Sequence, residues 1–191
     1  MSKFSFLRNK KILLILPFWN ASFLNKNMGK LIKRLMSERV DLHVYCAGTT
    51  QDDHFHRKFP EATLHNVRIP KGNRGTSFLQ VLRSYWIFAN LLLKIKPDCV
   101  LWTYAGYREN FLLWLFSHFF KLPYVIKLDS RMSTTHENWR SKIWDFLVFK
   151  LPVKKSCMVL AETKVVESYA VNAYPDANIL YFTNGVPVSE F

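Results

Sequence analysis

The chain has 191 residues, enough for one α/β domain with a substantial core and too few for two domains of ordinary size. With 49% apolar and 21% charged residues, the composition excludes an intrinsically disordered protein. The formal net charge of +13 favours an anionic partner, and because the cations are scattered along the chain we rank a phosphate group or a membrane surface above nucleic acid.

The first sixteen residues combine basic residues with a short apolar run, as a signal peptide does. The run leads into Pro17 without a small-x-small cleavage pattern, so we interpret it as a buried first strand. Other apolar segments are interrupted by charges or are too short to cross a bilayer. We therefore expect a cytoplasmic protein, with peripheral attachment to the inner face of the membrane as a further option.

The three cysteines, Cys46, Cys99 and Cys157, each fall in an apolar, strand-like run. We expect all three to be buried small side chains in a reducing compartment. No pair has the spacing of metal ligands, so the sequence predicts no metal site.

Segments with a strand pattern alternate with segments with a helix pattern along the whole chain. The expected strands are 11–16, 41–47, 65–69, 99–103, 124–128, 158–161 and 179–182. The expected helices are 28–36, 77–95, 109–120, 141–149 and 163–173, with Asn27 and Thr163 as N-caps and with 51–59 as a loop. This alternation predicts an α/β fold, a doubly wound, mostly parallel Rossmann-like sheet with helices on both faces.

Four segments carry a resemblance to a known family: KILLILPFWN at 11–20 followed by Met28-Gly29, KPDCVL at 96–101, LPYVI at 122–126, and ILYFTNGV at 179–186 with Phe191 behind it. In this order they resemble the amino-terminal domain of GT-B retaining glycosyltransferases of the group 1 / family 4 type. The resemblance implies a Rossmann-like glycosyltransferase domain over 1–183. It also implies that 184–191 begins a linker to a carboxy-terminal donor-binding domain, for which this chain has no room.

The resemblance implies transfer of a sugar from a nucleotide-diphosphate sugar to an acceptor hydroxyl, with retention of configuration and without a metal or another cofactor. It implies a sugar or lipid-linked acceptor, a role in cell-envelope polysaccharide or glycolipid synthesis, and no activity of this chain alone. The alternative is a non-catalytic subunit that binds the acceptor or anchors to the membrane and works with a separate donor-binding chain. A dinucleotide-dependent oxidoreductase is disfavoured because no G-x-G-x-x-G follows the first strand.

The turn after the first strand is the candidate diphosphate site. A helix amino terminus presents free N–H groups and a partial positive charge, which suit a phosphate. Gly29 permits a close backbone approach, Lys30 adds a cation, and Asn27 precedes them. The family usually has a glycine pair here, where this chain has Met28-Gly29, and an ordinary turn between strand and helix is the alternative.

Polar residues also follow other predicted strands. Asp129 follows strand 124–128, where the family often has His, and we propose it as a catalytic or sugar-binding carboxylate, with pairing to Arg131 as the structural alternative. The residues expected to bind the acceptor are Tyr104, Tyr107, Arg108 and Arg131. Glu162 and Asn184 are expected at the cleft edge, with a solvated loop carboxylate and a surface turn as the alternatives.

The segment 139–155 combines aromatic and aliphatic residues with five cations. An interfacial helix on an anionic membrane has this composition, and it predicts salt-sensitive binding to such membranes. The alternative is a helix that covers the sheet and turns its cations to water.

Overall fold

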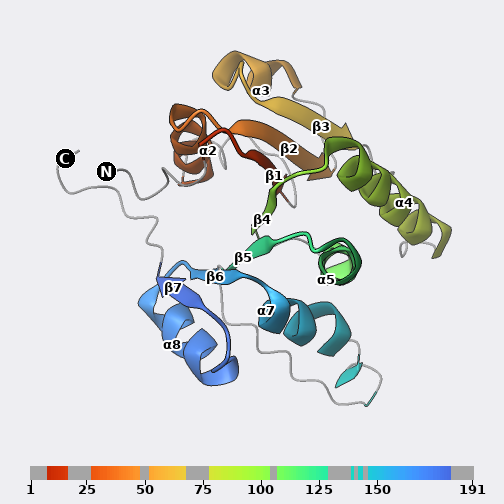
Figure 1. Ribbon diagram of the computed structural model, residues 1–191, viewed down its shortest axis with the longest axis vertical. Helices are drawn as coiled ribbons and strands as arrows, with labels where there is room; N and C mark the ends of the chain where they lie inside the picture. Colours follow the sequence, from red (N-terminus) through yellow and green to blue (C-terminus); the bar gives the residue numbers. More distant parts are fainter. Residues whose placement is uncertain are drawn as a thin grey trace.

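The structure, a computed structural model, describes residues 8–16, 27–47, 52–67, 78–103, 107–128, 139, 142–143 and 146–181. Within these residues the strands form one sheet in the order β3-β2-β1-β4-β5-β6-β7, and every neighbouring pair is parallel (Figure 1). The strands are β1 (Lys11–Leu16), β2 (Asp41–Ala47), β3 (Thr63–Val67), β4 (Cys99–Thr103), β5 (Tyr124–Leu128), β6 (Met158–Ala161) and β7 (Ile179–Tyr181). The helices are α2 (Asn27–Ser37), α3 (Asp52–Lys58), α4 (Phe78–Ile95), α5 (Tyr107–Phe120), the π-helical turn η2 (Phe146–Lys150), α7 (Leu151–Lys155) and α8 (Lys164–Ala173).

The predicted doubly wound sheet is confirmed. From β1 the chain moves outward through β2 to β3, returns to β4 beside β1, and then moves outward in the opposite direction. Right-handed crossovers therefore place the helices of the two halves on opposite faces. α2 and α3 share a core cluster on one face, whereas α4, α5, α7 and α8 share the cluster on the other (Figure 1).

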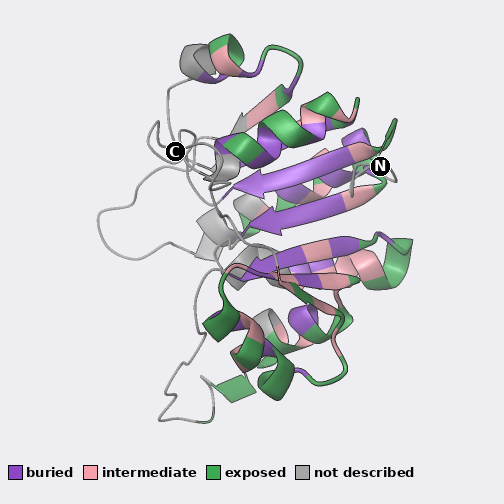
Figure 2. Cartoon of the chain, turned by 90° about the vertical axis from the view of Figure 1, so that its left-hand side faces the viewer, coloured by how far each residue is buried: buried purple, intermediate pink, exposed green. Residues whose placement is uncertain are grey.

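The central strands are covered on both faces, and their sequences show why. Leu13 and Ile15 join the cluster under α4 and α5, whereas Leu14 and Leu16 join the cluster under α2. All four are at most 1% exposed, and Figure 2 shows these strands buried along nearly their whole length. A continuous aliphatic run is what a parallel strand buried on both sides requires.

The prediction of a loop over 51–59 is wrong, because α3 occupies most of this segment. Phe55 and Phe59 are fully buried, and their ring centroids lie 5.2 Å apart. Two apolar residues four positions apart lie on one side of a helix. This anchor holds a helix whose other residues are mostly polar.

The structure also differs from the predicted helix over 141–149. Trp139, Lys142 and Ile143 are helical, and the next described residues form η2 and α7, which end at Lys155. Pro152, at the start of α7, has no N–H to donate to the preceding turn. A π-turn is one way for a helix to absorb such a break in its hydrogen bonds.

Smaller differences concern element ends and single side chains. β3 begins and ends two residues earlier than expected, α5 begins at Tyr107, and β7 ends at Tyr181. Of the cysteines, Cys46 is buried and Cys99 partly buried, but Cys157 is exposed, which corrects the prediction that all three are buried. Cys157 precedes β6 and lies outside the sheet interior.

Candidate functional site

The carboxyl ends of the parallel strands and the amino ends of the helices that follow them share one edge of the sheet. At this edge the strand order reverses between β1 and β4, because β1 continues to α2 on one face and β4 to α5 on the other. Open α/β sheets bind ligands in the crevice at such a reversal. We call the ends of β1, β4, β5 and β6, with the helix starts that follow them, the switch-point edge.

Thr103 ends β4 at the switch-point edge, and its side chain connects β4 to β1. It is 1% exposed, and its hydroxyl donates a hydrogen bond of 2.8 Å to the carbonyl oxygen of Ile15. The last paired residues of the two strands are Ile15 and Trp102, so this bond extends the connection beyond the last pair. The buried hydrogen bond thereby fixes the point at which the strands diverge.

Lys127 lies beside Thr103 in register and therefore on the same face of the sheet. Its side chain is 5% exposed, and its Nζ lies 3.1 Å from Oε2 of Glu162, in the turn after β6. The backbone N–H of Glu162 donates to the carbonyl oxygen of Leu128 at 3.1 Å. The switch-point edge thus holds a buried ammonium, which a protein interior tolerates when a carboxylate is close by.

The structure places Glu162 in the turn after β6, with Lys127 as its partner, and its predicted place at a cleft edge stays a prediction. Thr163, which follows it, is the predicted N-cap of α8. Its hydroxyl oxygen accepts a hydrogen bond of 3.1 Å from the backbone N–H of Val166. The cap fixes the start of α8 and, with it, the turn that carries Glu162.

The first turn of α2 carries the residues predicted to hold a diphosphate. α2 begins at Asn27 itself, Gly29 is buried, and Lys30 is exposed. Because α2 connects two parallel strands, its amino end, with the partial positive charge of the helix dipole, lies at the switch-point edge. The fold therefore brings Lys30 to the same edge as the Lys127–Glu162 pair.

The other predicted site residues are described only in part. Tyr107 and Arg108 form the start of α5, but their side chains are not described. The same holds for the side chain of Asn27. Four residues lie wholly outside the described residues: Tyr104, Asp129, Arg131 and Asn184. The catalytic and acceptor-binding roles of these residues stay predictions.

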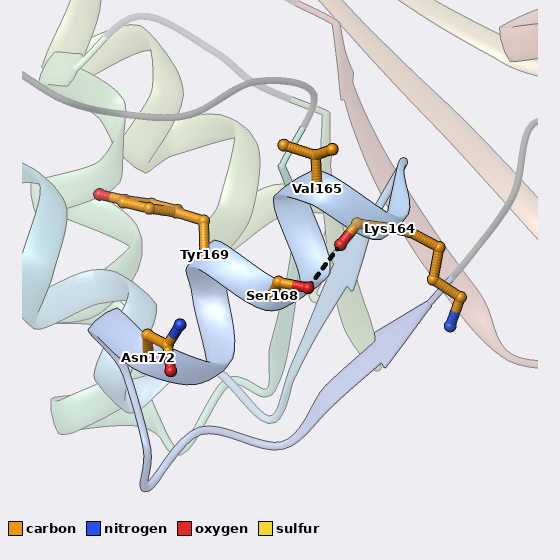
Figure 3. Close-up of a pocket in the computed structure, with 5 residues that line it drawn as sticks. All are labelled: Lys164, Val165, Ser168, Tyr169 and Asn172. Atoms are coloured by element: carbon orange, nitrogen blue, oxygen red, sulfur yellow. Dashed lines mark hydrogen bonds between the residues drawn. The ribbon is translucent and has the colours of Figure 1, made fainter.

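A surface hollow of about 500 Å³ lies along α8 (Figure 3). Its lining residues are Lys164, Val165, Ser168, Tyr169 and Asn172. The hydroxyl of Ser168 donates to the carbonyl oxygen of Lys164 at 3.0 Å, so that proton is already used within the helix. All the lining residues belong to one helix, and none was predicted from the sequence as a site residue. We therefore locate the candidate site at the switch-point edge and not in this hollow.

A second polar cluster lies on β2 and β3. Nδ1 of His43 is 2.9 Å from Nε2 of His65, and the two rings are stacked. Nε2 of His43 is 3.3 Å from Oδ1 of Asp41. The pKa of His65 is lowered, first by burial and then by the nearby His43 and Lys94. His43 and Asp41 belong to the first half of β2, away from the switch-point edge.

Sequence reasoning missed Thr103 and Lys127. The sequence contained an indication for Lys127: it is a charged residue inside YVIKL, a strand predicted to be buried on both faces, where lysine is rare. Such a lysine needs an anionic partner close by. In the part of the chain that the structure describes, no group of three or more His, Cys, Asp or Glu could hold a metal ion.

No protein-family profile matches the chain, and no curated protein matches it either. Solved structures do match. UDP-GlcNAc 2-epimerase from Methanocaldococcus jannaschii is 17% identical with a TM-score of 0.62, over 90% of this chain and 45% of that one. Sucrose-phosphate synthase from Thermosynechococcus elongatus is 12% identical with a TM-score of 0.64, over 95% and 50%. A glycosyltransferase from Rickettsia africae is 13% identical with a TM-score of 0.64, over 93% and 44%.

The chain therefore spans about half the length of these solved structures. At such low identity the likeness concerns the fold, and the parallel sheet with its strand order agrees with it. The resemblance first noted in the sequence is thus supported at the level of architecture: this chain has the Rossmann-like α/β fold of one half of a GT-B protein.

Proposed function

We propose that this chain is the amino-terminal, acceptor-side half of a glycosyltransferase that uses a nucleotide-diphosphate sugar as donor. Similar folds include a sucrose-phosphate synthase, a further glycosyltransferase and an epimerase named for a UDP-sugar. We propose further that transfer proceeds with retention, requires no metal, and serves cell-envelope polysaccharide or glycolipid synthesis. These finer assignments rest on the sequence resemblance.

The switch-point edge is the observation that carries this proposal. It combines the amino end of α2, the exposed side chain of Lys30 and the Lys127–Glu162 pair. Helix amino termini and cations stabilise the negative charge that a leaving diphosphate develops during sugar transfer. In this proposal the β1–α2 turn grips part of the diphosphate, while Asp129 and the start of α5 face the acceptor.

The second part of the proposal is a donor-binding unit, supplied either by the same polypeptide or by a separate chain. An incompletely covered face of the sheet favours such a unit. On the face that carries Thr103 and Lys127, the same cross-strand row continues through Leu160 to Leu180, which is 48% exposed. Within the described residues, α2 and α3 pack on this face and do so near β1 and β2. A segment of the second unit would complete the cover that parallel strands require.

Titration with UDP tests the diphosphate grip. We expect UDP to shift the backbone amide NMR signals of Gly29 and Lys30, and inorganic sulfate at equal ionic strength to shift them much less. Lys30→Gln removes the cation at the helix start and should weaken UDP binding about fivefold, the equivalent of about 1 kcal/mol. Lys33→Gln is the matched control, because Lys33 is exposed one turn further along α2.

Two results would contradict the assignment. In the first, UDP leaves the signals at the start of α2 unchanged at millimolar concentration. In the second, Lys33→Gln weakens UDP binding as much as Lys30→Gln does, which would indicate a diffuse charge effect instead of a site.

A further inference from the structure

Helix α4 has two apolar faces, and only one of them is buried in the described structure. Phe88, Leu92 and Ile95 lie in the core cluster under the helix. On the outer side, Leu82, Trp86 and Leu93 are 46%, 70% and 49% exposed. We call these three residues the α4 ridge.

The α4 ridge is continuous along the helix. With about 100° of rotation per residue, its three members fall within roughly 40° of arc, and they span about 16 Å. Single apolar residues scattered over a surface are normal, whereas large apolar side chains in one row indicate an interaction surface.

The helices beside α4 also expose aromatic side chains. α5 packs beside α4 on the same face of the sheet (Figure 1). Phe119 and Phe120 end α5 and are 69% and 63% exposed. η2 packs on α5 in turn, and Phe146 in η2 is 52% exposed. Phe119 and Phe120 lie on the side of α5 that carries the buried Leu112 and Leu113, so they extend the core-facing side of α5 at its carboxyl end and do not extend the α4 ridge.

Positive charge predominates on α4 and α5, whose sequences contain one acidic residue, Glu109 near the start of α5. The segments 78–97 and 110–128 contain no Asp and no Glu. They contain exposed cations beside the apolar residues: Arg83, Lys94, Lys96 and Lys121. A second copy packed against these helices would bring cations against cations, so the charge disfavours a homodimer here.

We propose that the α4 ridge docks on the surface of an anionic lipid bilayer. A convex helix with exposed Trp and Leu needs no complementary groove when it enters the headgroup region, and the flanking cations pair with anionic headgroups. The sequence predicted membrane contact by the segment 139–155, and the structure adds α4 as the principal contact. No helix in the described part of the chain is long and apolar enough to cross a membrane. The proposal holds whether or not the protein transfers sugars.

Vesicle flotation with the full chain tests the proposal. The probes are vesicles of phosphatidylcholine alone and of phosphatidylcholine with 30 mol% phosphatidylglycerol, at low and high salt. We expect binding to the anionic vesicles that falls as salt rises, and weak binding to the neutral ones. The double variant Trp86→Glu/Leu93→Glu should lower the partition coefficient at least tenfold.

The matched control carries the same two charge changes on another helix. Val165 and Val171 on α8 are 53% and 51% exposed, so Val165→Glu/Val171→Glu alters net charge equally at equally exposed apolar positions. We expect this control to bind anionic vesicles within about twofold of the wild type. Circular dichroism and thermal unfolding of both variants verify that the fold is intact, as substitution of exposed side chains should allow.

Three outcomes would overturn the proposal. The first is equal recovery of the wild type with neutral and anionic vesicles, or no recovery with either. The second is an equal loss of binding in the α8 control, which would show that net charge alone governs recovery. The third is a concentration-dependent dimer in sedimentation analysis that Trp86→Glu/Leu93→Glu dissociates, which would assign the ridge to a second copy of this chain.

Discussion

Nζ of Lys127 lies 3.1 Å from Oε2 of Glu162, across the ends of β5 and β6. The lysine side chain is 5% exposed and the glutamate side chain 22% exposed, so the two charges differ in their access to water. A buried charge left without its counter-charge costs more than the pair gains when it is intact. The two single substitutions should therefore have unequal effects.

We expect Glu162→Gln to lower the free energy of unfolding by about 2 kcal/mol, because it removes the negative charge that lies 3.1 Å from the buried ammonium of Lys127. Lys127→Met removes the buried charge and keeps an apolar side chain of similar length, so it should cost less than about 1 kcal/mol. Urea unfolding at pH 7.5 measures both.

The matched control is Glu167→Gln, which removes the partner of the exposed Lys164 at 2.7 Å. An exposed pair contributes little, so we expect a change below about 0.5 kcal/mol. Should Lys127→Met prove more damaging than Glu162→Gln, the buried-charge explanation would be wrong, and packing around the lysine stem would govern stability here.

The cysteines should separate by reactivity. Burial, with smaller contributions from Cys157 and Asp98, raises the pKa of the Cys99 thiol to about 12, and Cys46 is buried. Because only a thiolate attacks a disulfide reagent, we expect Cys99 and Cys46 to react on the order of 100-fold more slowly than the exposed Cys157 at pH 8. Labelling with an aromatic disulfide reagent, read by mass spectrometry, measures these rates.

The control for this labelling is Cys157→Ser, which should abolish the fast phase and leave the slow ones unchanged. All three thiols should react in denaturant, because unfolding exposes them. A fast phase that survives in Cys157→Ser would mean that β4 opens far more readily than its place in the sheet suggests.

The His43–His65 pair predicts a loss of stability on acidification. Burial, His43 and Lys94 lower the pKa of His65 in the folded chain, so the unfolded chain binds a proton more readily. The stability that comes from neutral His65 is fully present above its ordinary pKa of 6.5 and is lost as pH falls through its lowered folded value. On its other side, Nε2 of His43 lies 3.3 Å from Oδ1 of Asp41.

Urea unfolding at pH 7.5, 6.5 and 5.5 checks this prediction. His65→Gln should flatten the decline below pH 6.5, whereas His56→Gln, at an exposed position on α3, should leave the decline unchanged. A decline of equal slope in wild type and His65→Gln would assign the acid sensitivity to other groups.

Most of the fold was predictable because buried parallel strands have a plain signature. The aliphatic run of β1 and the mostly apolar run of β4 predicted the strand limits found in the structure. α3 could not be predicted from the apolar pattern, because Phe55 and Phe59 are the two large apolar residues of an otherwise polar segment. They stabilise the helix by packing into a core cluster formed by residues far away in the sequence. The loop prediction failed for this reason, since tertiary packing overrides local composition.

The candidate site was predictable in location and less so in its residues. The rule that ligands bind at the carboxyl ends of strands brought Gly29, Lys30 and Glu162 to one edge. The pairing of Glu162 with Lys127 joins residues 35 positions apart, and its register follows from how β5 and β6 align in space. Sequence spacing alone does not contain that alignment.

The final prediction concerns activity. If the proposed function holds, we expect the 191-residue chain alone to transfer no sugar from UDP-glucose or UDP-GlcNAc to membrane-derived acceptors, because the proposal assigns the donor site to a second unit. Without that unit, charge on the leaving diphosphate would meet water instead of fixed hydrogen-bond donors. Radiolabelled transfer assays, with and without a second GT-B half supplied by co-expression of the neighbouring coding sequence, measure this directly.

The DNA that follows codon 191 decides between the two forms of the proposal. An in-frame α/β domain with a Glu-x7-Glu segment would make this chain part of a single-chain enzyme, and joining the two should restore transfer. A separate donor-domain gene nearby would favour the two-subunit form. Transfer by the 191-residue chain alone would contradict the half-enzyme argument, because the chemistry would then need no second unit.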